Sequence, residues 1–164
     1  MMTSSVDELS ANDGDFAVVA DNLKVIRGKR VALDGVSVRI PRGTITGLLG
    51  PSGCGKTTFI RAIVGTQIVA SGTVTVLGHP AGSPPLRRRV GYVTQAPTIY
   101  SDIKVIDNVR YFAALYGIAP GAADDAIRNV GLSDHSDDYS GNLSGGQRTR
   151  VSLACALVCQ PDLL

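Results

Sequence analysis

Hydrophobic and polar residues alternate most clearly over residues 31–40, where Val36, Val38 and Ile40 are separated by polar side chains. A period of two predicts a strand with one buried face. Short apolar or β-branched runs predict further strands, which together fill most of the first part of the chain: 16–19, 44–49, 73–77 and 90–94.

Apolar residues then recur with the helical period, which predicts four helices, each ending at a residue that favours a helix end. They span 56–64 before Gly65, 105 to Gly117, 122–130 before Gly131, and a long helix from the cap Ser144 to the residues before Pro161. Polar loops join them at 79–85 and 134–142. Strands followed by helices in this order predict an α/β fold with a helical subdomain.

The composition is that of an ordinary soluble domain. Of the 164 residues, 44% are hydrophobic and 18% are charged, and the formal net charge is +2. That charge is too small to imply nucleic acid, and the absence of Trp argues against a base-stacking surface. Arg87 to Arg89 form the densest basic patch, which we interpret as a solvated helix face.

Residues 1–15 are polar and acidic and contain no signal-peptide pattern, so we expect a disordered lead-in before a domain at 16–164. No apolar run approaches the roughly 18 residues that a membrane span needs. We therefore expect a cytoplasmic chain whose membrane role, if any, comes through a partner.

The cysteines are Cys54, Cys155 and Cys159, an odd count that argues against a disulfide framework. Cys155 and Cys159 are four apart and are expected to share a helix face as small buried side chains rather than as metal ligands. His79 and His135 lie in polar loops without partner spacing, and we assign neither a role.

A phosphate-binding loop is predicted at residues 50–57, which fit G-x-x-x-x-G-K-[ST] between an expected strand and a helix. Glycines let backbone N–H groups turn toward a triphosphate, and the helix N-terminus adds partial positive charge. Lys56 would reach the β- and γ-phosphates and the Thr57 hydroxyl would bind magnesium. The predicted nucleotide contacts are Gly50, Pro51, Ser52, Gly53, Cys54, Gly55, Lys56, Thr57 and Thr58.

A second motif, Leu143-Ser144-Gly145-Gly146-Gln147, opens the long helix. Ser144 at the N-cap and two exposed-backbone glycines create a second anion-binding helix end. One chain rarely needs two such ends for one triphosphate, whereas two copies facing head-to-tail would use them in pairs. We therefore add four predicted nucleotide contacts: Ser144, Gly145, Gly146 and Gln147.

With these motifs in this order, residues 16–164 resemble the ATP-binding cassette (ABC) family, whose LSGGQ signature matches at all five positions. The resemblance implies a P-loop NTPase core with an N-terminal antiparallel β region and an inserted α-helical subdomain at about 98–145. It also implies an ATPase that uses ATP and Mg²⁺, a head-to-tail dimer with a second nucleotide-binding domain, and a transmembrane permease partner that holds the subunit on the inner membrane face.

Gln95 follows the expected strand at 90–94 and looks like the family's Q-loop glutamine, which contacts magnesium and the attacking water. The resemblance thus assigns catalysis to Lys56 and Gln95 and magnesium to Thr57 and Gln95. Residues 98–117 look like the region that docks on the membrane partner. Their sequence is similar to that of ATPase subunits of drug and antibiotic exporters with separate membrane subunits, which leads us to expect export.

The sequence departs from the family in two places. Relatives place an aromatic residue under the adenine where this chain has Arg27, which stacks more loosely. The family's Walker B strand, catalytic glutamate and switch histidine follow a segment like 160–164. We therefore expect them beyond these residues, and we expect residues 1–164 alone to be incomplete at the C-terminus and not to hydrolyse ATP at a useful rate.

Other functions remain open from the sequence. A soluble ABC-type ATPase of translation or DNA repair shares both motifs, although repair members carry a long insertion between glutamine and signature that this chain lacks. A non-catalytic ATP-binding module also remains possible from the sequence, because the glutamate that acts as general base is not among these residues. A small-molecule P-loop kinase has no use for LSGGQ. Neither the substrate nor the identity of the membrane partner follows from the sequence.

Overall fold

The computed structural model describes residues 13–164, which form two compact units with the boundary between Leu86 and Arg87, and the units are treated separately below. Most of the expected lead-in lies outside the described residues. Its last part is ordered, because Asp13–Asp15 form a short 3-10 helix, η1. Arg42 holds this turn, donating from Nε to the Gly14 carbonyl at 2.8 Å. The expected disorder is therefore wrong for these three residues.

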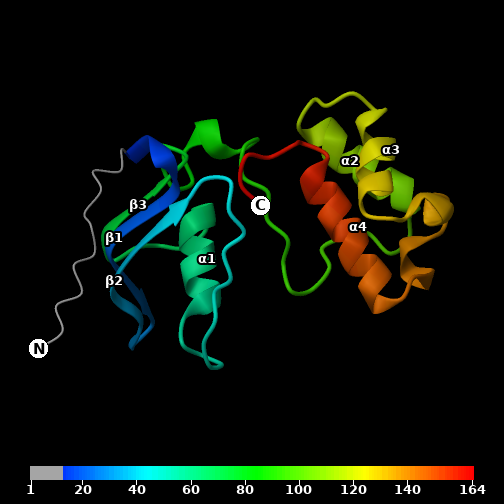
Figure 1. The fold of residues 1–164 in the computed structure, drawn as a ribbon. Helices are drawn as coiled ribbons and strands as arrows, with labels where there is room; N and C mark the ends of the chain where they lie inside the picture. Colours follow the sequence, from blue (N-terminus) through cyan, green and yellow to red (C-terminus); the bar gives the residue numbers. More distant parts are fainter. Residues whose placement is uncertain (1–12) are drawn as a thin grey trace, which may run out of the picture. The chain divides into compact units, whose positions relative to one another are not determined.

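The first unit is built on a four-stranded antiparallel sheet in the order β2-β1-β3-β4 (Figure 1). Its strands are β1 (Phe16–Arg27), β2 (Arg30–Pro41), β3 (Ser71–Val76) and β4 (His79–Pro80). β1 runs much further than the predicted 16–19. Polar Asp21 and Asn22 break its alternation at a register shift, after which Leu23 and Val25 are fully buried again.

Helix α1 (Lys56–Val64) has the predicted bounds and ends at Gly65 in the left-handed conformation. It packs against β2 and β3 through Phe59 and Ala62. Helix η2 (Pro84–Leu86) follows β4, so the expected loop at 79–85 contains two short elements.

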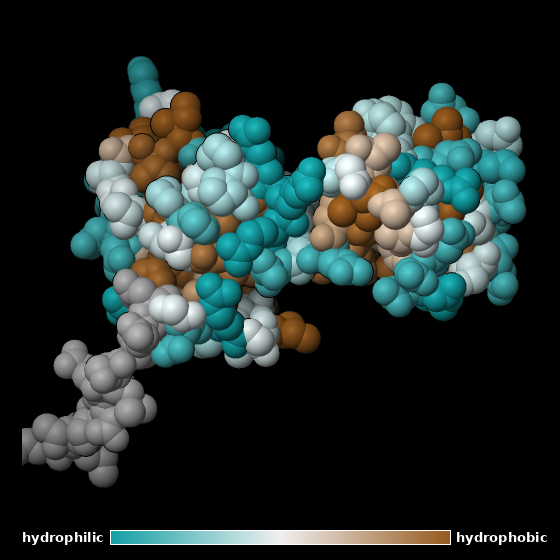
Figure 2. All heavy atoms as spheres, turned by 90° about the horizontal axis from the view of Figure 1, so that it is seen from above, coloured by the Kyte–Doolittle hydropathy of each residue, from teal (hydrophilic) through white to brown (hydrophobic). Residues whose placement is uncertain are grey.

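The predicted strand at 44–49 is wrong for this structure, because the segment pairs with no strand of its unit and Ile45 and Leu49 are almost fully exposed. A run of apolar side chains indicates that a segment could be buried, whereas a strand also needs backbone hydrogen-bond partners along its edge. Apolar side chains accordingly reach the surface of the molecule, which is coloured by hydropathy in Figure 2.

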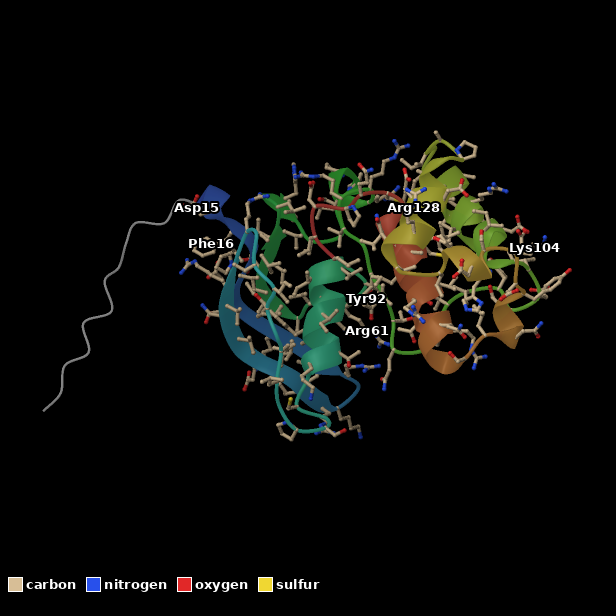
Figure 3. The ribbon with its side chains drawn as sticks, turned by 45° about the vertical axis from the view of Figure 1, so that its right-hand side comes forward. Asp15, Phe16, Arg61, Tyr92, Lys104 and Arg128 are labelled. Atoms are coloured by element: carbon tan, nitrogen blue, oxygen red, sulfur yellow. The ribbon has the colours of Figure 1, made fainter. Side chains whose placement is uncertain are left out.

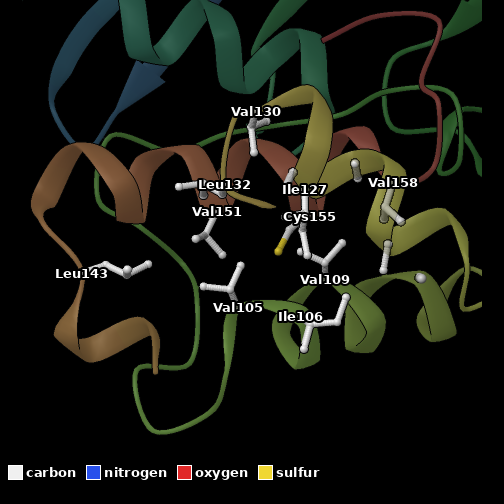
Figure 4. Close-up of a cluster of buried hydrophobic side chains, with 14 residues drawn as sticks. Val105, Ile106, Val109, Ile127, Val130, Leu132, Leu143, Val151, Cys155 and Val158 are labelled. Atoms are coloured by element: carbon white, nitrogen blue, oxygen red, sulfur yellow. The ribbon is translucent and has the colours of Figure 1, made fainter. Parts of the chain in front are cut away.

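The second unit contains α2 (Val105–Leu115), α3 (Ala122–Asn129) and α4 (Gly145–Leu157), together with the 3-10 helices η3 (Ser133–His135) and η4 (Ser140–Asn142). The three longer helices confirm the predicted periods. The expected loop at 134–142 instead contains the 3-10 turns. Figure 4 shows the shared core of the unit, which includes Val105, Val109, Ile127, Leu132, Val151 and Cys155.

Two further expectations are corrected in this unit. The predicted strand at 90–94 is reduced to one parallel bridge, in which Gly91 N donates to Leu163 O at 2.8 Å. Residues 87–89 form a turn and not a helix face, and Arg89 makes an ion pair with Asp162. A single bridge fixes too few hydrogen bonds to hold a strand of five residues.

Of the two helical cysteines, Cys155 is buried as predicted, and burial raises the pKa of its thiol to about 12. Cys159 lies beyond the end of α4 and is partly buried, so the two do not share one helix face. Among residues 13–164, no helix is both long and apolar enough to cross a membrane. The predicted α/β class, with an antiparallel N-terminal sheet and a helical region, is confirmed.

Candidate nucleotide-binding site

Residues 50–57 form an exposed loop that leads into α1, and the loop is seated directly on β2. The contact is made by Gly55, the N-cap of α1, which has a φ of 99°. A Cβ atom there would lie 2.7 Å from the carbonyl oxygen of Ala32 and 2.7 Å from Cδ2 of Leu33. Only glycine allows both this conformation and this close approach.

The Lys56 ammonium lies inside the curve of the loop. Its Nζ donates to the carbonyl oxygens of Gly50 at 2.6 Å and Pro51 at 2.7 Å, and it is 3.7 Å from Sγ of Cys54. Among the described residues, no carboxylate forms an ion pair with it. The two neutral acceptors leave the positive charge uncompensated, so an incoming anion can replace them.

The first turn of α1 is open to an external acceptor. Gly55 provides no side-chain cap, and no acidic residue occupies the first turn. Backbone N–H groups at the start of a helix have no intrahelical partner, and the helix dipole makes this end partially positive. The loop, the lysine and the helix end therefore fit a group that carries several negative charges, such as a triphosphate.

The exposed Thr57 hydroxyl lies next to Lys56 on this first turn, whereas the neighbouring Thr58 side chain is buried. No group of three or more His, Cys, Asp or Glu side chains in residues 13–164 could hold a metal ion by itself. Magnesium commonly takes one or two protein oxygens together with phosphate and water. One hydroxyl beside a triphosphate site is compatible with that preference.

Two side chains at the edge of the loop are also exposed. Cys54 is a free, exposed cysteine. Arg27 is exposed at the end of β1, where it pairs with Arg30 at the tip of the hairpin. Because Ala32 of the same hairpin touches Gly55, this tip lies on the loop side of the sheet.

The second motif begins α4 with a capping box around Ser144. Gln147 N donates to Ser144 Oγ at 3.3 Å, and Ser144 N donates to Gln147 Oε1 at 2.8 Å. The serine oxygen accepts in this arrangement, so its own O–H remains available to donate outward. Gly145 and Gly146 are exposed in the first turn, where their N–H groups have no intrahelical acceptor.

The structure adds one side chain to which the sequence assigned no role. His135 places Nε2 at 2.9 Å from Nε2 of Gln147 and Nδ1 at 2.7 Å from Oδ2 of Asp138. The sequence offered one signal for this contact, a histidine and an aspartate three residues apart shortly before a capping box. The contact to Gln147 joins residues twelve apart and has no local signature.

The predicted site residues form two groups, one in each unit. Residues 50–58 gather around Lys56 in the first unit, and residues 144–147 gather at the start of α4 in the second. Gln95 belongs to the second unit, where it is exposed in a segment without helix or strand. A cavity of about 330 Å³ lies near the C-terminal end of α1, lined among others by Ala62, Gly65 and residues of β3, and no residue of 50–58 lines it.

Residues 33–164 match the family model described as ABC transporter. The chain is 41% identical over 155 residues to the sulfate/thiosulfate import ATP-binding protein CysA of Mycobacterium tuberculosis, covering 91% of this chain and 44% of that protein. It is 35% identical over 149 residues to the Nod factor export ATP-binding protein I of Cupriavidus metallidurans, covering 87% and 49%.

The fold is similar to that of cbiO1 from Clostridium perfringens, described as part of the ABC transporter complex cbiONQ. The TM-score is 0.80 at 28% identity, covering 90% of this chain and 63% of that one. The chain thus spans about half the length of the curated relatives it matches, at 44% and 49% of theirs.

Proposed function

This chain belongs to the ABC transporter family, and from that premise we propose that it supplies the ATP-binding part of a transporter ATPase subunit. One observation carries the proposal. The Lys56 ammonium is held by uncharged acceptors, the carbonyls of Gly50 and Pro51 and Sγ of Cys54, at the uncapped start of α1. A cation, free backbone N–H groups and a helix dipole converge on one exposed point, as binding of a triphosphate requires.

Each loop residue has a distinct part in this proposal. Lys56 exchanges its two carbonyl acceptors for oxygens of the β- and γ-phosphates. Gly50 and residues 52–55 contribute backbone N–H groups, Pro51 has none to give, and the side chains of Ser52 and Cys54 remain outside the chemistry. Thr57 offers its hydroxyl to Mg²⁺, and Thr58 contributes through its backbone because its side chain is buried. Bound Mg²⁺ neutralises developing charge on the phosphates.

The two remaining groups are proposed to act on two different nucleotides, Gln95 on the ATP of its own chain and the signature motif on ATP held by a second copy. Gln95 is proposed to contact Mg²⁺ and the attacking water, a role that its exposed place in an irregular segment permits. Ser144, Gly145 and Gly146 are proposed to contact ATP that a second copy holds in its own loop, in a head-to-tail dimer. Their exposure at the start of α4 supports this, because a partner chain can reach them.

The proposal places the subunit on the inner face of the membrane, bound to a permease. Family membership and the description of cbiO1 as part of a transporter complex support a membrane partner. We further propose that the direction of transport is export, because the sequence of residues 98–117 is similar to that of exporter ATPases. The relatives are named for import and for export, so direction has to be measured.

The test is transport by the full-length protein reconstituted in vesicles with candidate permeases, beginning with any multi-span membrane protein encoded beside it. We expect ATP added on the side of the ATPase subunit to drive substrate across the bilayer, and Lys56→Ala to stop it. The direction of flux relative to that subunit decides between export and import. ATP hydrolysis that the membrane protein neither alters nor uses would instead favour the soluble ATPase.

A further inference from the structure

The side chains behind the first turn of α4 form a hydrogen-bonded chain that reaches the signature motif. His135 contacts Asp138 on one side and the Gln147 amide on the other, at 2.7 Å and 2.9 Å. Gln147 in turn closes the capping box with Ser144. The inference below rests on the proposed function, in which Ser144 meets ATP held by a second copy.

The direction of every bond in this chain follows from one backbone group. The Ser144 N–H can only donate, so the oxygen of the Gln147 amide must face it. The amide NH₂ then faces Nε2 of His135, and this nitrogen must accept. The ring proton is therefore on Nδ1 and is donated to Asp138, which fixes the neutral tautomer of His135.

The segment that carries His135 and Asp138 is held in place by backbone hydrogen bonds to α2. Asp138 O accepts from Val105 N, and Ser136 O accepts from Ile106 N, both at 3.0 Å, so this segment caps the start of α2. Lys104, labelled in Figure 3, adds an ion pair with Asp137 at 2.9 Å. The start of α4 is exposed and would fray more easily without such support.

We propose that His135, oriented by Asp138, is a positioning residue for the signature motif. It holds the Gln147 amide, and through the capping box it holds the Ser144 hydroxyl and the N–H groups of Gly145 and Gly146 in the direction of the partner's nucleotide. No part of this role requires His135 to touch ATP.

The bond directions imply that only neutral His135 performs this role. An imidazolium has no acceptor nitrogen, so Gln147 must either lose this contact or turn its NH₂ toward the Ser144 N–H and break the capping box. The charged group in contact with the ring is Asp138, α4 presents the neutral amide of Gln147, and Asp137 on the same segment is paired with Lys104.

The experiment compares His135→Leu with His135→Gln in the full-length protein. Leucine removes the acceptor, whereas a glutamine oxygen can stand in place of Nε2. ATP-driven dimerisation is measured with ATP and EDTA by analytical ultracentrifugation, and ATP binding by each monomer is titrated separately. We expect His135→Leu to weaken dimerisation about 3- to 10-fold, the effect of one hydrogen bond, with monomer binding unchanged and with His135→Gln near wild type.

Rescue by His135→Gln is a readout that a purely structural role would not give, because glutamine restores the acceptor atom but not the shape of the ring. Ser144→Arg separates the two levels of the argument. If Ser144→Arg dimerises normally, the proposed trans role of the motif fails. If Ser144→Arg is defective while His135→Leu matches wild type, or if glutamine does not rescue, the role of His135 fails.

Discussion

Replacing Lys56 by alanine should remove most of the affinity for ATP and leave the fold unchanged. The ammonium is the one side-chain cation held inside the curve of loop 50–57, where its acceptors are the carbonyls of Gly50 and Pro51. Both carbonyls belong to exposed residues, so water replaces the lost donor in Lys56→Ala. The variant should therefore unfold at the wild-type temperature to within about 1 °C.

The size of the affinity loss follows from the bonds that are exchanged. In the free protein Lys56 makes two hydrogen bonds to neutral oxygens, at 2.6 and 2.7 Å. On binding, these become bonds in which both partners are ionised, the ammonium and the phosphate oxygens, so attraction between opposite charges is added. A charged hydrogen bond contributes about 1.5–3 kcal/mol, and a net loss of about 2–3 kcal/mol raises the Kd roughly 30- to 150-fold.

The assay is isothermal titration of ATP into the full-length protein, with EDTA present so that hydrolysis does not consume the ligand. Arg39→Ala is the matched control, because Arg39 is exposed on β2 opposite Val19 and its loss removes the same charge. A Kd for Lys56→Ala within twofold of wild type would refute the phosphate-binding assignment. An equal loss in Arg39→Ala would show that net charge, not the loop, attracts the nucleotide.

Three further changes test other parts of the structure. Ser144→Arg should leave ATP binding by the monomer unchanged and abolish ATP-driven dimerisation in analytical ultracentrifugation, whereas equal loss of both would contradict a role in trans. Cys54→Ala should retain ATP hydrolysis. In the wild type, N-ethylmaleimide should label Cys54 only in the absence of ATP, as mass spectrometry of a digest would show. Cys155 should stay unlabelled in the same digest, because burial raises the pKa of its thiol to about 12. The fully buried Asn108 side chain accepts from the backbone N–H of Tyr100 and donates to its carbonyl oxygen, so Asn108→Leu should lower the free energy of unfolding in urea by about 2–4 kcal/mol. Asp107→Ala, at an exposed position, should lower it by less than about 0.5 kcal/mol. A small loss for Asn108→Leu would show that the Tyr100 backbone groups find water instead.

The elements that the sequence predicted well are those with local causes. The bounds of α1 follow from the loop glycine before it and Gly65 after it, and the cap at Ser144 follows from its spacing to Gln147. Each of these signals acts within one or two turns of backbone. Helix periods and capping residues could therefore be interpreted without knowledge of the rest of the fold.

Strands were predicted less well because a strand depends on its neighbours. β1 continues past Asp21 and Asn22, where alternation fails and the pairing with β2 is interrupted, because β2 and β3 pair with it both before and after these residues. Residues 44–49 have the short apolar run that predicts a strand and yet form no strand, because none of the strands of their unit pairs with them. Side-chain period predicts which face would be buried, whereas pairing decides whether the strand exists.

The candidate site shows the same division. The residues of loop 50–57 and of the signature could be named from motifs, since a run of fixed residue types carries their geometry. The role assigned to His135 could not, because its contact with Gln147 crosses from η3 to α4 and depends on how the two helices are joined. A lone histidine in a polar loop gives no indication of the ring's tautomer, which here follows from the backbone N–H of Ser144.

The two helix ends of the candidate site differ in a way that orders the proposed events. The start of α1 has no side-chain cap and holds an uncompensated lysine beside it, so it can bind a triphosphate on its own. The start of α4 already satisfies one N–H through Ser144, and no lysine or arginine lies in residues 144–147, so it offers a hydroxyl and two glycine N–H groups. Neutral donors of about 1 kcal/mol each cannot capture free ATP from water, but they can add to a nucleotide that another loop already holds. ATP binding to the loop should therefore precede dimerisation, and the small energies at α4 make dimerisation sensitive to the exact direction of Ser144.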